Sequence, residues 1–150
     1  MFGEIAKGRI GDTLLQQYGS NTDIAGLREA AGIFDELSGR SAVPAIRLQS
    51  YQKLGRCRRD LGEHRRALAA YEQTLLYARV LKNQGMAFDP KYCYLSVDEA
   101  LSILEESRFA NRRQWGMRIM DSYRKLGLKG AVEDMDKREK EFVERCNMEM

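Results

Sequence analysis

The chain has 150 residues, of which 43% are hydrophobic, 31% are charged and only two are proline. This composition is typical of a globular helical protein and excludes a disordered or fibrous class. The net charge of +3 is too small to indicate a nucleic-acid-binding protein by itself.

Cysteine usage and hydropathy indicate a cytoplasmic protein with no membrane span. Cys57, Cys93 and Cys146 lie far apart and form no CxxC pair, which argues against a disulfide framework or a zinc ribbon. The first ten residues carry three charged side chains and no apolar core of signal-peptide length. Nowhere do about 18 apolar residues follow one another. We therefore expect a reducing compartment.

Helical periodicity divides the first half of the chain into four predicted helices. They cover about residues 5–18, 23–37, 43–61 and 63–83, and Asp23 is the predicted N-cap of the second. The breaks that end these helices contain glycine: residues 19–22, Gly39, Gly62 and Gly85. Short connections favour antiparallel neighbours.

The second half of the chain continues the helical pattern. Asp89-Pro90 predicts a helix start, and Ser96-Val97-Asp98-Glu99 has the pattern of a capping box, so one helix or two short ones end near Ser107. An apolar stripe from Phe109 to Leu126 predicts the next helix, which glycines at 127 and 130 terminate. A charged last helix over 132–143 is expected to cap the fold. The prediction is a single all-α domain over residues 1–150.

One motif lies in the third and fourth predicted helices. It reads Tyr51-x2-Leu54-Gly55-x2-Arg58, then Leu61-Gly62, then Ala67-x3-Tyr71. This pattern resembles the tetratricopeptide repeat (TPR), with one good repeat at about residues 47–80. Small residues at 55 and 67 let two helices approach closely, the side chains at 54 and 71 fill the space between them, and Leu61-Gly62 supplies a tight turn.

The match has departures and two weaker echoes. Arg58, Thr74 and Arg79 stand where the repeat usually has an aromatic residue, a small residue and a proline. Ala30-x3-Phe34 and Tyr123-x2-Leu126-Gly127 repeat parts of the motif and suggest weaker flanking repeats. The resemblance implies a TPR-like superhelix of antiparallel helical hairpins with a C-terminal capping helix.

The resemblance also implies a concave groove lined by the first helix of each hairpin. The predicted groove residues are Gln49, Gln52, Arg56 and Arg59 in the third helix and Gln114, Met117, Asp121 and Arg124 in the sixth. Glutamine and arginine can hydrogen-bond an extended peptide and pair with its carboxylates. We predict a scaffold or adaptor that binds an acidic peptide, a chain terminus or a partner subunit. The alternative for each residue is an ordinary solvated side chain.

Charge distribution leaves other functions open. Residues 41–82 contain nine basic and three acidic side chains, a local excess that attracts acidic partners. The arginines that could contact nucleic-acid phosphates are Arg56, Arg58, Arg59, Arg65, Arg66, Arg112 and Arg113. The tyrosines fall mostly on apolar stripes rather than on a stacking platform, so nucleic acid is the second choice. A structural subunit of a larger assembly, or a homo-oligomer through exposed repeat ends, is the third.

Little in the sequence indicates catalysis. His64 is the only histidine and lies at a predicted turn, and the cysteines have the character of small buried hydrophobic residues. Phosphate-binding glycine motifs such as GxxxxGK are absent. We expect neither an enzyme nor a cofactor or metal site.

Overall fold

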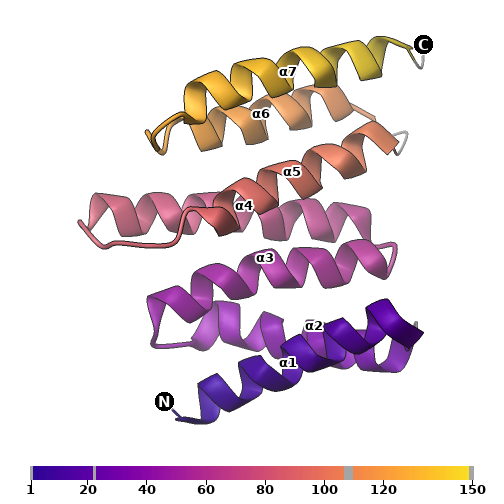
Figure 1. The fold of residues 1–150 in the computed structure, drawn as a ribbon, viewed down its shortest axis with the longest axis vertical. Helices are drawn as coiled ribbons and strands as arrows, with labels where there is room; N and C mark the ends of the chain where they lie inside the picture. Colours follow the sequence, from indigo (N-terminus) through magenta and orange to yellow (C-terminus); the bar gives the residue numbers. More distant parts are fainter. Residues whose placement is uncertain (1, 22, 107–109, 149–150) are drawn as a thin grey trace. The chain divides into compact units, whose positions relative to one another are not determined.

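The computed structural model describes residues 2–21, 23–106 and 110–148 (Figure 1). Within these ranges the chain forms seven helices and no strand, which confirms the all-α prediction. The chain divides into two compact units, Met1–Thr74 and Leu75–Met150, and the division falls inside the fourth helix. The expectation of a single domain stays a prediction.

The first unit contains α1 (Phe2–Asn21), α2 (Ile24–Arg40), α3 (Pro44–Asp60) and the first part of α4 (His64–Asn83). Helix α2 packs against α1 and α3, and α1 also contacts α3. Neighbouring helices in this unit run antiparallel (Figure 1). This is the packing of successive helical hairpins.

Local signals determine where two of these helices begin and end. The Asp23 carboxylate accepts a hydrogen bond from the Gly26 N–H at 3.2 Å, which confirms the predicted N-cap. After α3, Gly62 adopts a φ of +79°. Its N–H donates to the carbonyl of Arg59 at 2.9 Å, and the next N–H, of Glu63, donates to that of Arg58 at 2.8 Å. This glycine cap reverses the chain between α3 and α4.

Glycines lie opposite aromatic rings where the helices approach most closely. A Cβ atom added to Gly55 would lie 2.5 Å from Tyr71 Cε1, and one added to Gly11 would lie 2.8 Å from Phe34 Cζ. Both rings are buried. Gly55 and Tyr71 therefore have the packing roles that the motif predicts. Phe34, in the earlier partial copy of the motif, packs against Gly11 as Tyr71 packs against Gly55.

The second unit contains the remainder of α4 with α5 (Lys91–Glu106), α6 (Arg112–Arg124) and α7 (Ala131–Met148). Helix α6 packs against α5 and α7, and α5 also contacts α7. The buried carboxylate of Glu105 accepts hydrogen bonds from Arg138 and Arg145, each at 2.5 Å. These ion pairs join α5 to α7.

Three predicted features differ in the structure. Helix α5 is continuous and Ser96 is buried in its interior, so the predicted capping box is wrong. Helix α2 continues past Gly39 to Arg40, because that glycine keeps a helical backbone. The C-cap of the helix is Ser41. Helix α1 continues past the predicted break at Gly19. The predicted helix ends near Ser107 and Phe109 lie outside the described residues.

The echo at Tyr123-x2-Leu126-Gly127 also differs from the prediction. Gly127 follows the end of α6 with a φ of +64°, so it cannot have the helix-packing role of Gly55. Gly116 has this role in the second unit, because an added Cβ atom would overlap the ring of Phe142. Among the described residues, no helix combines the length and the apolar character needed to cross a bilayer.

Candidate functional site

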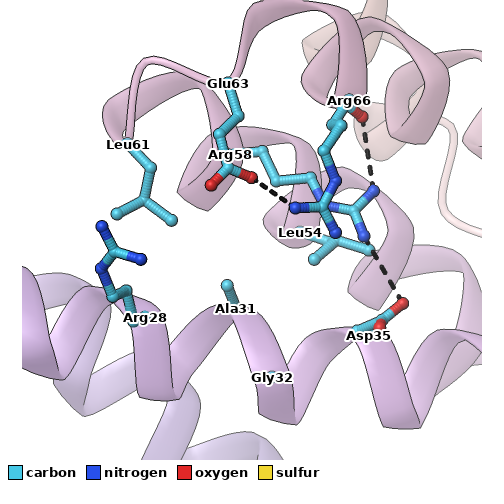
Figure 2. A pocket seen from close by; sticks show the side chains of 9 residues that line it. All are labelled: Arg28, Ala31, Gly32, Asp35, Leu54, Arg58, Leu61, Glu63 and Arg66. Carbon is cyan, nitrogen blue, oxygen red and sulfur yellow. Dashed lines mark hydrogen bonds and ion pairs between the residues drawn. The ribbon is translucent and has the colours of Figure 1, made fainter.

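The first unit contains a pocket of about 240 Å³ where α2, α3 and the start of α4 meet (Figure 2). We call it the arginine pocket. It is lined by Arg28, Ala31, Gly32, Asp35, Leu54, Arg58, Leu61, Glu63 and Arg66.

Helical spacing places these side chains together. On α2, Ala31, Gly32 and Asp35 follow Arg28 by three, four and seven positions. The four residues therefore share one face of that helix. Leu54, Arg58 and the C-cap Leu61 follow the same spacing along α3. The glycine turn then folds α4 back so that Arg58 Nη1 donates to the backbone carbonyl of Arg66 at 3.4 Å.

The pocket contains more positive than negative charge. Arg58 Nη2 lies 3.6 Å from Asp35 Oδ1, and Arg66 Nη1 donates to Glu63 Oε1 at 2.8 Å. The Arg58 side chain is only 15% exposed. Burial lowers the pKa of Arg58 and the neighbouring Arg66 charge lowers it further, although the two carboxylates oppose this. An additional anion would therefore stabilise the charged guanidinium.

Arg28 supplies the third guanidinium. Its side chain is exposed and, among the described residues, forms no hydrogen bond or ion pair. Figure 2 shows Arg28 and Arg58 on opposite sides of the pocket, with Ala31 pointing into the space between them. Leu54, which is buried, and half-buried Leu61 add apolar surface. The arrangement suits an anionic group with a small apolar neighbour.

The pocket brings together only part of the arginine set predicted for phosphate contacts. Arg58 and Arg66 meet, whereas Arg65 is exposed outside the pocket. In the second unit, Arg112 Nη2 donates to the carbonyl of Cys146 at 2.9 Å, and Arg113 is exposed. Arg28 was not predicted, because it belongs to a segment with an acidic excess and reaches the site only through the packing of α2 on α3.

The predicted groove residues of α3 occupy different environments. Gln49 lines a second cavity, of about 160 Å³, with residues of α1, α2 and α3. Gln52 is only 1% exposed, so the prediction that it faces an open groove is wrong. It lies one turn after the buried Leu48, on a face of α3 that the sequence pattern suggested was solvated. Arg56 and Arg59 are half-buried, and their predicted role in binding stays a prediction.

The predicted groove residues of α6 lie in the second unit. Arg124 donates to Asp121 at 2.8 Å and, on α7, to Asp136 at 3.0 Å and Glu139 at 3.1 Å. These three carboxylates surround the guanidinium, which thereby joins α6 to α7 and is poorly placed to attract an acidic ligand. Gln114 is exposed and Met117 is half-buried, and a binding role for them stays a prediction.

The cysteines and His64 do not line the arginine pocket. The cysteines are buried, and burial raises the pKa of Cys57 and Cys93 to about 12. His64, half-buried, is the first residue of α4. No group of three or more His, Cys, Asp or Glu side chains is placed to hold a metal ion within the described part of the chain.

Comparisons with models of protein families, with curated proteins and with solved structures found no match to this chain.

Proposed function

We propose that the chain is a TPR-like protein-interaction module, acting as a cytoplasmic adaptor or scaffold, whose first unit binds an acidic segment of another protein. The observation that carries this proposal is the arginine pocket, in which Arg28, Arg58 and Arg66 come from three helices to one cavity. Guanidinium groups form charge-assisted, often bidentate hydrogen bonds with carboxylates.

The size of the pocket supports a peptide ligand. Small-molecule and cofactor sites usually measure about 300–1,000 Å³, whereas this pocket measures about 240 Å³. A cavity of that volume accommodates one or two side chains of a bound segment. The rest of the segment would lie on the exposed surface around it.

Helix packing supports the TPR-like part of the proposal. In the first unit, α2 packs on both of its neighbours and α1 also contacts α3. The contacts of Gly55 with Tyr71 and of Gly11 with Phe34 give successive hairpins the same close approach. Repeated hairpins of this kind form helical arrays that present binding surfaces.

Nucleic acid fits the pocket less well than a peptide does. Asp35 and Glu63 line the cavity with the arginines, and their carboxylates would repel neighbouring phosphates. None of the described residues that line the pocket has an aromatic side chain that could stack on a base.

A peptide-display selection on the full chain tests the proposal. Random peptides would be selected on the wild type and then measured against Arg28→Glu/Arg66→Glu. The matched control is Arg65→Glu/Arg79→Glu, which makes the same charge change at two exposed arginines outside the pocket. We expect enrichment of acidic peptides whose affinity falls at least about tenfold in the pocket variant and less than about threefold in the control.

Other results would contradict the proposal. Peptides without acidic enrichment, or equal losses in the two variants, would remove the pocket from the binding site. A labelled single-stranded oligonucleotide should bind more weakly than the selected peptides at physiological salt. Tighter oligonucleotide binding, with a steep dependence on salt and equal sensitivity to both variants, would instead favour nucleic-acid association.

A further inference from the structure

We infer that the arginine pocket recognises a single carboxylate next to an apolar side chain, with Arg28 as the group that pairs with it. This inference rests on the proposed function, because it specifies the chemistry of the acidic segment. The carboxylate can be the terminus of a partner chain or an acidic side chain within it.

Charge balance indicates one negative charge. The described residues that line the pocket supply three guanidinium groups and two carboxylates. Asp35 lies 3.6 Å from Arg58, and Glu63 accepts from Arg66 at 2.8 Å. Arg28 is left without an ion pair among the described side chains. A single carboxylate beside Arg28 makes the pocket neutral, whereas a phosphate dianion adds excess negative charge close to the two acids.

The floor of the pocket indicates an apolar neighbour to that carboxylate. Ala31, Leu54 and Leu61 present hydrocarbon to the cavity. Gly32 lies mid-helix in α2, and an added Cβ atom would meet no atom within 4 Å apart from its chain neighbours and the backbone of its own helical turn. The missing side chain at this exposed position leaves room for one from a ligand, which would gain from leaving water.

Gly32 also offers a way to fill the pocket without changing its charge. Gly32→Leu places a side chain in open space on α2, and glycine is a poor helix former, so the variant should fold at least as stably as the wild type. The matched control is Gly39→Leu, because Gly39 lies on the same helix, also has open space around it and does not line the pocket.

Three capped dipeptides serve as probes for the full chain, with binding followed by two-dimensional NMR titration. Acetyl-Gly-Leu with a free carboxylate presents a terminal charge, acetyl-Asp-Leu-amide presents a side-chain charge, and acetyl-Gly-Leu-amide presents none. We expect the better of the two acids to bind at least about tenfold more tightly than the neutral amide. Which acid binds better identifies the source of the carboxylate.

The variants then assign the site. Arg28→Gln and Gly32→Leu should each weaken the better acid at least about tenfold, and Gly39→Leu should change it less than about twofold. Inorganic phosphate and acetate should bind more weakly than that acid. Equal binding of acid and amide, tighter binding of phosphate, or unchanged binding in Gly32→Leu would overturn the inference.

The two proposals can fail separately. If display selection yields acidic peptides that depend on the pocket arginines but the dipeptides show no preference for a carboxylate beside leucine, the proposed function stands and this inference fails. If neither experiment depends on the pocket arginines, both fail.

Discussion

The contact between Gly55 and Tyr71 allows a stability effect to be worked out from the structure. In Gly55→Ala, the new methyl group would lie 2.5 Å from Tyr71 Cε1 and 2.7 Å from Cδ1, where ordinary contact begins at 3.4 Å. The ring is fully buried, so it must move by about 1 Å within a packed core. Overpacking costs about 1–3 kcal/mol, and better helix propensity returns up to about 1 kcal/mol. We expect a net loss of about 1–2 kcal/mol.

Chemical denaturation followed by circular dichroism measures this loss. Gly32→Ala is the matched control, because an added methyl group there meets nothing within 4 Å and should stabilise the fold by about 0.5–1 kcal/mol. Opposite signs for one substitution at two helical glycines would verify the packing argument. A Gly55→Ala variant as stable as the wild type would refute it. Replacing Tyr71 with leucine in the same variant should recover part of the loss by making room for the methyl group.

Three further predictions concern buried thiols, a buried ion pair and the predicted groove. Because burial raises the pKa of Cys57 and Cys93 from 9.0 to about 12, both thiols should resist a thiol reagent at pH 8 until the chain is unfolded. Between pH 9 and 12 the thiols of the unfolded chain lose their protons while those of the folded chain keep them. The free energy of unfolding should therefore fall by up to about 1.4 kcal/mol per pH unit for each thiol. Chemical denaturation at a series of pH values measures this fall. Glu105→Gln should lower the free energy of unfolding by about 2–3 kcal/mol in a denaturant titration. The substitution removes the carboxylate that pairs with Arg138 of α7, whose side chain is only 15% exposed. A loss below about 0.5 kcal/mol would contradict this. Arg56→Glu/Arg59→Glu should lower the affinity for a selected acidic peptide less than about threefold, because only long-range attraction is lost. Fluorescence anisotropy measures this affinity, and a tenfold loss would instead indicate that the peptide binds at the predicted α3 groove.

Short-range patterns predicted much of the fold because their physics is local. Asp23 caps α2 through its own side chain, and Gly62 adopts the backbone conformation that a tight turn requires. The same reasoning failed at Ser96, where the local capping pattern lies within an apolar face that continues through Val97 and Leu101. Burial of that face stabilises an uninterrupted helix more than a cap at its middle would.

Binding residues were harder to predict because their exposure depends on tertiary packing. Gln52 is polar and was expected to face solvent, yet it is buried as deeply as Leu48 one turn earlier. Arg124 has the expected chemistry, but three carboxylates of its own unit surround it. Periodicity along one helix gives no information about which neighbouring helix covers each face.

Arg58 is one of three residues at which the sequence differs from the TPR pattern that it resembles, and it lines the arginine pocket. The repeat that the sequence resembles usually has an aromatic side chain at the position of Arg58, and a ring there would make the space between α2 and α4 apolar. Arg58 instead places a charge 3.6 Å from Asp35 and donates to the backbone of Arg66. Burying a guanidinium costs more free energy than burying a ring of similar size, so packing alone does not explain an arginine at this position. The proposed binding role of the pocket would explain this cost, because residues that serve function often lower stability.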